Sequence, residues 1–556
     1  MVWQVAMAGG SLFAFALSLA LWFATGNVLA PPIVWIGAAV WAGVMAPAAE
    51  TSPVAPWVGT VGLLSAVALI AWGRARARPA AYLSPTRKQP RAEAMTARPV
   101  SQPWHAGELS IADLRLMRLI LDRALQPVQA FDGFDWLDQF QTAAVRYQLN
   151  FASYALSMAH SVHLPAFDGY LTEAQHSLAG KAQDHRIWRY WQLESLWGNL
   201  DASTDPIVRD NVMFSGFLAA QLAWARNAGG PCGFDRRSSL VFAEPSGRRY
   251  AYSLPCLLRT LERNMAAAPF GLMPCEPNWI YPLCNTIAAT ALSAGDTAYG
   301  TSRWQRLEDR FETALLTEFS RPDGSFVPFR SSLTGLAGPA VGGAVMQAFP
   351  CFFLNATLPH LAARHWERTA PMLTEDRFRR ALWPVDVGNY GFSRASSYAA
   401  SAAAAREMGD DDVARRLLAA LDEECPGIVV EGAMHRPRVS LWAHAVELMA
   451  RCGEAGALAR LINTSKPPSG PRLAHVPYPD ILVARAVAAD DGLDLVLHSD
   501  AGPARASLRF TGLMPRRAYQ LRGSEIGLGN SDAAGEMVVD IPVERRTTFY
   551  LLPAEG

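Results

Sequence analysis

The first 73 residues constrain this chain most, because Glu50 is the only charged residue among them. They contain three apolar runs, over residues 5–24, 28–46 and 57–72, separated by short segments with proline and polar residues. Each run approaches the roughly 20 residues with which a helix crosses about 30 Å of hydrocarbon. We therefore predict a membrane domain over residues 1–73 with three transmembrane helices; two spans with a re-entrant segment are the alternative.

A basic segment follows directly. Between residues 74 and 98, one acid, Glu93, stands against seven basic side chains: Arg74, Arg76, Arg78, Arg87, Lys88, Arg91 and Arg98. Basic residues flank transmembrane helices on the cytoplasmic side and are attracted to anionic headgroups. We predict that residues 74–108 form a basic linker, rich in Pro and Ala, that contacts membrane lipid. The same rule predicts a multi-pass protein of the cell inner membrane with its soluble domain on the cytoplasmic side.

Residues 109–466 have the apolar spacing of amphipathic helices, interrupted by Pro, Gly or Asp clusters. The clearest predicted helices are 114–125, 134–162, 206–226, 254–268, 281–294, 304–319, 395–408 and 412–421. Strand-like alternation is nearly absent here, and a solenoid would need a fixed repeat of about 30 to 45 residues that the sequence does not show. We predict an all-α (α/α)6-type toroid, whose central cavity is the natural substrate site.

The pattern changes after Pro467. Short segments such as 482–486, 493–498 and 505–510 alternate apolar and polar residues, with turn signals between them. This alternation predicts that the toroid, preceded by the transmembrane helices, is followed by a small antiparallel β-sandwich over residues 467–556. We expect this module to act in packing or as a lid, without chemistry of its own.

Charge and cysteine content limit the class of partner and the compartment. The 50 basic residues balance 50 acidic ones, which argues against a dedicated nucleic-acid binder. Half of the residues are hydrophobic, which excludes a disordered chain. The seven cysteines include no CxxC pair and cannot all pair within one chain, so a reducing compartment is the simpler interpretation.

One segment, residues 269–285, departs from the composition of the helices around it. Its proline-rich loop holds Cys275 and Glu276, and Cys284 and Asn285 begin the next helix, where the helix dipole favours a thiolate. Two thiols, a carboxylate and an amide thus fall within one local structure. The wide spacing of the cysteines and the lack of a flanking histidine predict no metal site. Taken singly, each cysteine also fits a buried apolar side chain.

A second polar cluster ends in Thr204-Asp205-Pro206. An acid before proline is a good helix start, so Asp205 is either a helix cap or a polar group of the site. Aromatic residues near both clusters fit an apolar cavity, although such residues also build helical cores. These are Trp197, Trp279 and Tyr281.

Three stretches together resemble the linalool dehydratase-isomerase family. The first runs from residue 186 through Asp205-Pro206 to Met213-Phe214-Ser215-Gly216. The second is the Cys-Glu-Pro motif at 275–277 with Cys284-Asn285, and the third is residues 405–410. The similarity covers roughly residues 116–421, and the Cys-Glu-Pro element is its most specific part.

This resemblance implies an (α/α)6 barrel that works without a metal or organic cofactor, forms a homo-oligomer and takes a small lipophilic substrate. The implied reaction is the reversible loss of water from a tertiary allylic alcohol, together with its isomerisation to a primary one. By position, Cys275 and Cys284 resemble the two cavity thiols and Glu276 their neighbouring carboxylate. Asp122 resembles the aspartate supplied near the start of the helical body.

The sequence departs from the family pattern at two positions. Phe217 stands where the family has a histidine after the glycine of its Met-aromatic-x-Gly element, and the family's tyrosine is replaced near Val128 or Gln129. Two groups that bind a hydroxyl are thus missing, which points away from linalool itself as the substrate.

We favour a membrane-anchored, cofactor-independent lyase or isomerase that acts on an allylic terpenoid or a similar lipophilic alcohol. One alternative is a glycan-processing toroid, hydrolase or lyase, with Glu276 and Asp205 as its two carboxylates. A catalytically silent membrane scaffold is the other. Under the favoured hypothesis the catalytic residues are Cys275, Cys284, Glu276 and Asp122, and the substrate-binding residues are Asn285, Phe217, Trp279, Tyr281, Trp197 and Asp205.

Overall fold

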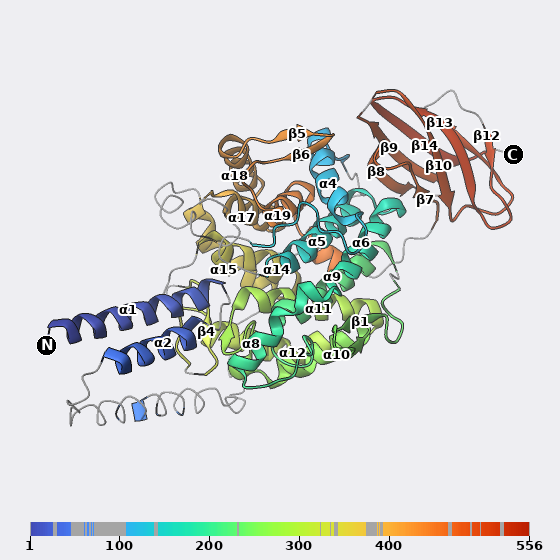
Figure 1. Ribbon diagram of the computed structural model, residues 1–556. Helices are drawn as coiled ribbons and strands as arrows, with labels where there is room; N and C mark the ends of the chain where they lie inside the picture. The colour runs from blue at the N-terminus through green and yellow to red at the C-terminus, as the bar shows by residue number, and fades with distance from the viewer. Residues whose placement is uncertain are drawn as a thin grey trace.

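A computed structural model of the chain shows a helical body between an N-terminal pair of helices and a C-terminal β unit (Figure 1). The structure describes residues 2–25, 30–45, five positions between 61 and 71, 107–137, 143–230, 233–322, 324–333, 335–338, 343–373, 386, 389, 393–464, 470–489, 492–500, 502–522 and 528–554.

Within the described residues, the helical body is a double ring. Six helices contact one another in a closed circle: α5 (Val145–His163), α9 (Val212–Gly229), α11 (Pro282–Tyr299), α14 (Phe349–Thr357), α17 (Ala395–Glu407) and α19 (Leu441–Cys452). Six more pack outside them: α4 (Ile111–Ala124), α6 (Gly169–Ala182), α10 (Leu254–Ala267), α12 (Arg303–Thr317), α15 (Pro359–Leu373) and α18 (Asp411–Glu424). Short helices α7 (His185–Trp188), α8 (Tyr190–Gly198) and α13 (Ala344–Gln347) connect them.

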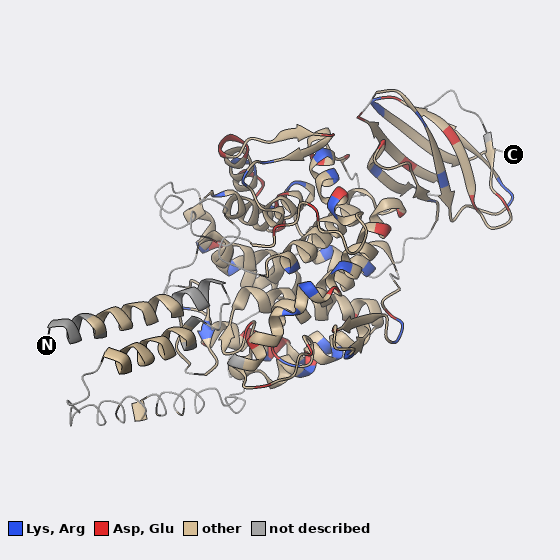
Figure 2. Ribbon diagram, in the orientation of Figure 1, with Lys and Arg blue, Asp and Glu red and all other residues tan. Residues whose placement is uncertain are grey.

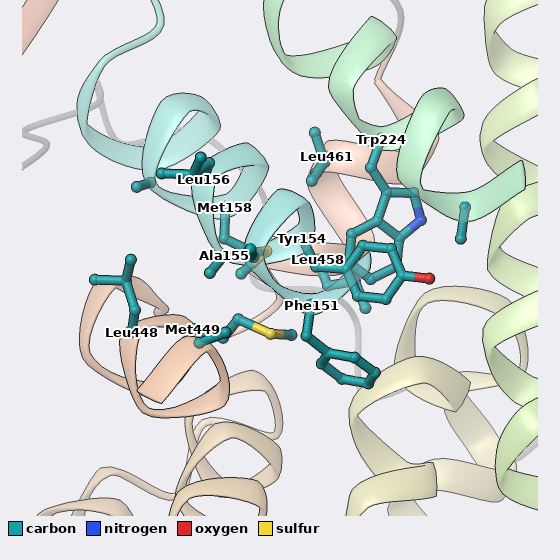
Figure 3. Close-up of a cluster of buried hydrophobic side chains, with 14 of the residues drawn as sticks. Phe151, Tyr154, Ala155, Leu156, Met158, Trp224, Leu448, Met449, Leu458 and Leu461 are labelled. Carbon is teal, nitrogen blue, oxygen red and sulfur yellow. The ribbon is translucent and has the colours of Figure 1, made fainter. Parts of the chain in front are cut away.

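Burial separates the two layers. Outer helices such as α10 bury one apolar stripe, whereas α5 and α9 are buried on nearly every side. Aromatic rings fill the space between the inner helices: the ring centroids of Tyr154 and Trp224 are 4.5 Å apart, and those of Phe151 and Trp442 are 5.1 Å apart. Figure 3 shows Phe151, Tyr154 and Trp224 in one cluster with residues of α19 and α20 (Ala457–Asn463). This packing fixes the inner helices as a rigid frame.

The helix α20 closes one end of the ring. Asn227, near the end of α9, donates hydrogen bonds to the carbonyls of Leu461 and Ile462, 3.3 Å each. The hydroxyl of Ser293, late in α11, lies 3.1 Å from Oδ1 of Asn463. The carboxyl ends of the inner helices therefore gather under α20, and their amino ends lie at the opposite end of the ring.

Three small sheets correct the prediction of an all-α body. Antiparallel pairs form between β1 (Leu240–Ala243) and β2 (Arg249–Tyr252), between β3 (Trp279–Ile280) and β4 (Arg330–Ser331), and between β5 (Ile428–Val430) and β6 (Ala433–His435). Strands this short do not produce a readable alternation, which is why the sequence pattern missed them.

Two predicted helices begin later than expected. The helix expected from residue 134 begins at Val145, because Asp135 instead accepts a hydrogen bond from the backbone N–H of Leu441, 3.1 Å, at the start of α19. The helix expected from residue 206 begins at Val212, because Asp210 and Asn211 have positive φ, 43° and 55°, which a helix cannot contain.

The predicted membrane domain is also corrected. The first two apolar runs form the helices α1 (Val2–Thr25) and α2 (Ala30–Met45), which pack together and whose described positions carry no charge (Figure 2). Among the described residues, no helix is long and apolar enough to cross a membrane. In α2, for example, 16 residues rise only about 24 Å. The transmembrane helices and the multi-pass inner-membrane location are therefore not supported. The run 57–72 and the linker before residue 107 fall almost entirely outside the described residues.

The C-terminal unit consists of two antiparallel sheets. One has the order β13-β10-β7 and the other the order β12-β11-β14-β9-β8. The strands are β7 (Arg472–His475), β8 (Ile481–Ala489), β9 (Gly492–Ser499), β10 (Ala504–Thr511), β11 (Ala518–Arg522), β12 (Leu528–Asn530), β13 (Met537–Val543) and β14 (Arg546–Pro553). Backbone hydrogen bonds of 2.9–3.0 Å join β7 and β8 to the turn after α5, around Ala166.

Candidate active site

The segment 269–285 lies at the end of the ring opposite α20, where the inner helices begin. It begins with the 3-10 turn η1 (Pro269–Gly271), continues as a loop and enters α11 after β3. Cys284 lies in the first turn of α11, Met213 in the first turn of α9 and Arg146 in the first turn of α5. The candidate site is therefore built where three neighbouring ring helices begin.

Asn285 fixes the shape of this loop. Its side-chain amide donates to the carbonyls of Met273 and Tyr281, 2.9 Å each, and accepts from the backbone N–H of Met273 at 2.8 Å. The backbone N–H of Cys275 donates to the carbonyl of Trp279 at 2.8 Å, which closes the loop on itself. Asn285, predicted to bind substrate, thus uses its amide to brace the loop that presents Cys275.

The two thiols are in contact. Cys275 is fully buried, and Cys284 lies close enough for its thiol to affect the pKa of Cys275. Burial raises the pKa of Cys275 well above its usual value, and the contact with Cys284 and the charge of Glu276 raise it further. Cys275 is accordingly a neutral thiol at physiological pH.

Two buried carboxyl groups share one buried cation. Glu276 in the loop and Glu194 in α8 are 6% and 7% exposed. Burial raises the pKa of Glu276 to about 7, although the charge of Arg146 opposes this. Burial also raises the pKa of Glu194, and the charge of Glu276 adds to the effect. The guanidinium of Arg146 is buried as well, which alone would lower its pKa, but Tyr147, Tyr190 and both acids raise it overall.

Tyrosine side chains surround this cation. The Arg146 guanidinium lies 4.4 Å from the ring centroid of Tyr147 and 4.2 Å from that of Tyr190. It donates to the hydroxyl of Tyr147 at 2.9 Å, and that hydroxyl in turn donates to the sulfur of Met213 at 2.6 Å. The hydroxyl of Tyr190 donates to Oδ1 of Asn211 at 2.8 Å. Burial raises the pKa of Tyr147 and Tyr190, so both hydroxyls stay neutral.

Three predicted aromatic residues lie beside this group. Phe217 is buried with its ring centroid 5.9 Å from that of Tyr147, so it presents an apolar face where the family has a histidine. Tyr281 precedes α11, and burial followed by the charge of Glu276 raises its pKa. Trp279 packs against Phe329, with ring centroids 5.5 Å apart.

The remaining predicted residues lie elsewhere or outside the description. Asp205 accepts from the hydroxyl of Tyr252 at 2.7 Å and the backbone N–H of Ile207 at 2.9 Å, which makes it part of the β2 contact. Asp122 accepts from the hydroxyl of Tyr478, at the boundary with the β unit. The structure does not bring either acid together with Cys275. Trp197 belongs to α8, but its side chain lies outside the described residues.

Four residues of the cluster were not anticipated from the sequence: Arg146, Tyr147, Tyr190 and Glu194. The sequence contained only a weak signal for these residues. In α5 the polar residues Arg146, Gln148 and Asn150 are all buried, which an amphipathic pattern does not predict. Glu194 looks like a solvent-facing residue of a short helix until α8 is placed against the loop.

The described residues also bear on metal binding. No group of three or more His, Cys, Asp or Glu side chains among them is arranged to hold a metal ion.

Two comparisons with known proteins gave matches. The chain is similar in structure to an unsaturated glucuronyl hydrolase from Streptococcus agalactiae, with a TM-score of 0.36 and 11% sequence identity over 62% of this chain and 93% of that chain. The sequence profile of the linalool dehydratase/isomerase family matches residues 146–442. The match begins at Arg146, includes the Cys-Glu-Pro loop and spans the ring from α5 to α19. The chain therefore belongs to the linalool dehydratase/isomerase family.

Proposed function

We propose that the protein removes water from an allylic lipophilic alcohol, adds it back, or moves the hydroxyl along the allylic system, without a cofactor. The main observation behind this proposal is the buried carboxyl of Glu276, whose pKa is raised to about 7. It lies beside the free thiols of Cys275 and Cys284. A general acid works best when its pKa lies near the working pH. Membership of a dehydratase/isomerase family supports the assignment to this class of enzyme.

In this proposal Glu276 exchanges the protons. Its carboxylic acid gives a proton to the leaving hydroxyl, the C–O bond breaks, and water leaves an allylic cation. The carboxylate so formed takes a proton from the carbon next to the cation, which yields a diene. When water attacks the far end of the cation instead and gives a proton to the carboxylate of Glu276, the product is the isomerised alcohol and the acid is restored.

The other residues of the cluster hold the substrate. The thiols of Cys275 and Cys284 bind the hydroxyl, and the face of Phe217 provides an apolar wall for the hydrocarbon. The rings of Tyr147 and Tyr281 stabilise the positive charge of the cation through their π faces. The family also leads us to propose a homo-oligomer, which light scattering on the purified protein tests.

The first experiment is an incubation of the protein with a panel of allylic terpenoid alcohols, read by gas chromatography. The unchanged protein should form a diene or an isomerised alcohol. Glu276→Gln, which removes the proton-transferring group, should lose at least about 100-fold in turnover, and Cys275→Ala and Cys284→Ala, which remove groups that bind the hydroxyl, should each lose about tenfold. A saturated tertiary alcohol, which cannot give an allylic cation, should not react.

Cys256→Ala is the matched control, since Cys256 is a free thiol in α10 and belongs to no part of the cluster. Its turnover should equal that of the unchanged protein. Absence of turnover across the panel with folded protein would refute the proposal, and polysaccharide binding would favour a glycan-processing function instead.

A further inference from the structure

Glu194 and Glu276 each bury a carboxylate oxygen that lacks a hydrogen-bond partner. For both residues this atom is Oε2, and no donor among the described residues reaches it. A buried acceptor without a partner is unfavourable, and an ionised one more so. A carboxyl that keeps its proton avoids the buried charge and gains an O–H donor.

The backbones that carry the two acids are locked together. The side-chain amide of Asn278 donates to the carbonyl of Gly198 at 2.9 Å. A Cβ atom on Gly198 would lie only 2.2 Å from Cβ of Pro277, so the end of α8 packs directly on the loop. Glu194 lies one helical turn before Gly198, and Glu276 is next to Pro277. This contact holds the two buried acids close enough for the charge of Glu276 to raise the pKa of Glu194.

The charges of Glu194, Glu276 and Arg146 balance only when one of the two acids carries a proton. Arg146 is the cation, and it donates to the carbonyl of Ala143 at 2.7 Å and to the hydroxyl of Tyr147 rather than to either acid. Two ionised carboxylates with one guanidinium would leave a net buried negative charge, which is strongly unfavourable. The other titratable groups that face the pair are Tyr147, Tyr190, Tyr281, Cys275 and Cys284.

We propose that Glu194 and Glu276 share one proton at neutral pH, and that Glu194 is a positioning residue that keeps Glu276 supplied with it. This inference rests on the proposed function and deepens it. The pair gives its proton to the leaving hydroxyl, which departs as water, and is then doubly ionised beside Arg146. It regains one proton from carbon when the diene forms, so each turnover returns the pair to its starting state.

The pair is tested without substrate by infrared spectroscopy of protein that carries isotope-labelled glutamate. The titration uses a Glu407→Gln background, because burial also raises the pKa of Glu407, outside the site, to about 7. The titration runs from about pH 5 to about pH 9. The parent protein, which carries only Glu407→Gln, should still show a carboxylic-acid band above pH 7, where an ordinary glutamate is ionised. Glu194→Gln and Glu276→Gln should each abolish it, because the remaining acid is neutralised by Arg146 alone.

Lack of this band in the parent would overturn the inference, and so would its persistence in either folded single variant. The activity arm measures kcat against pH. Glu194→Gln should shift the decrease of kcat at high pH to a lower pH, by about one pH unit or more, because Glu276 then ionises more readily. A uniform loss of kcat without this shift would mean a merely structural role for Glu194. Since the infrared result needs no substrate, it separates failure of this pair from failure of the proposed function.

Discussion

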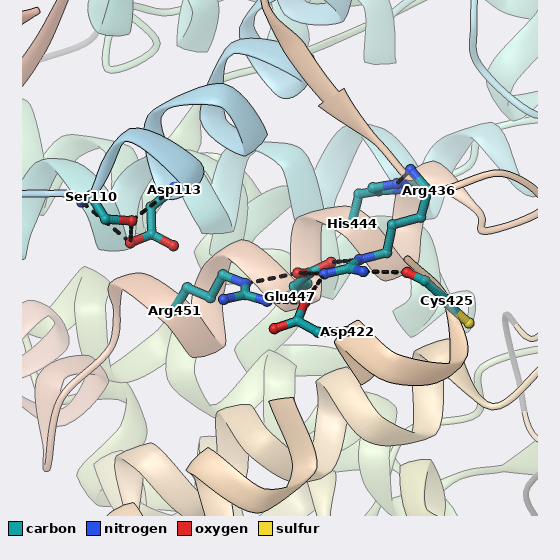
Figure 4. Close-up of polar contacts among 8 residues, drawn as sticks. All are labelled: Ser110, Asp113, Asp422, Cys425, Arg436, His444, Glu447 and Arg451. Carbon is teal, nitrogen blue, oxygen red and sulfur yellow. Dashed lines mark hydrogen bonds and ion pairs between the residues drawn. The ribbon is translucent and has the colours of Figure 1, made fainter. Parts of the chain in front are cut away.

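Glu447 and Glu276 are both buried acids, but their pKa values are shifted in opposite directions. Glu447 is 1% exposed and lies between two arginines (Figure 4). Arg436 donates to its oxygens at 2.8 and 2.7 Å, and Arg451 donates at 2.7 Å. Burial alone would raise the pKa of Glu447, but these bonds and charges lower it. Glu276 lacks such bonds and its pKa is raised. Direct donors therefore decide which buried acid is structural and which remains available for proton transfer.

Glu447→Gln should lower the free energy of unfolding by about 3 kcal/mol, because it removes the buried anion of the pair and leaves Arg436 with only the half-exposed Asp422 as an anionic partner. Since the folded pKa of Glu447 lies below its unfolded value, its contribution is present above about pH 4.5 and is lost as pH falls through the folded pKa. The measurement is denaturant unfolding at several pH values. Asp412→Asn, at an exposed pair with Arg415, is the control and should change stability by less than about 0.5 kcal/mol.

At the scale of elements, the site depends on where helices begin and on one close approach. The first turns of α5, α9 and α11 supply Arg146, Met213 and Cys284, and the end of α8 packs on the Cys-Glu-Pro loop through Gly198. The positions of these elements relative to one another set the geometry of the acids, and no single element carries the site.

Gly198→Ala should therefore reduce kcat by about tenfold or more, because a Cβ there must push Pro277 away and separate Glu276 from Glu194. The helical backbone accepts alanine at this position, so the loss of stability comes from the contact with Pro277 alone and should be about 1–3 kcal/mol. The control is Gly180→Ala in α6, where the nearest atom is a Val128 methyl at 3.2 Å and activity should be retained. Equal activity of both variants would contradict the role of this contact.

The helix and strand predictions succeeded where a segment is long and its pattern is regular. The helices α10, α12 and α18 and the strands β8 to β10 lie close to the predicted ranges. Burial follows the period of the element in these helices and in β10, whereas β8 and β9 are buried at most positions. Predictions failed at residues 134–137 and 206–211, where side chains make hydrogen bonds that compete with helix formation. Asp135 accepts from the backbone of Leu441, and Asn211 bonds the carbonyl of Pro206 and the hydroxyl of Tyr190. Two-stranded sheets inside the body left no readable pattern.

For the whole molecule, the helical body and the β unit form a continuous interface. The carbonyls of Ala484 and Ala486 accept from the backbone N–H groups of Leu109 and Ala166, 3.0 Å each. Arg472 forms an ion pair with Asp168 at the start of α6. Backbone groups of the helical body would lose these partners without the β unit.

Removal of residues 470–556 should lower the stability of the helical body by at least about 2 kcal/mol, since several backbone hydrogen bonds of about 1 kcal/mol each are lost. Tryptophan fluorescence during unfolding measures this directly, because the sequence has no tryptophan after Trp442. An unchanged midpoint would show that the body folds independently of the β unit.

Several features of this protein were determined by the sequence alone. Local periodicity places most helices and strands, because each element buries one face with its own repeat. Proximity along the chain groups Cys275, Glu276 and Cys284, since a short loop and one helical turn cannot separate them far. The similarity of these residues to a known family pointed to the same family as the profile match over residues 146–442.

Only the tertiary structure decided which charges face one another. Arg146 and Glu194 come from different helices far from the loop in sequence, and the packing of α5 and α8 at the amino end of the ring helices brings them to Glu276. The protonation of that acid depends on burial and on the number of cations beside it. Neither quantity exists before the ring closes, which is why the sequence could name Glu276 but not its proton-sharing partner.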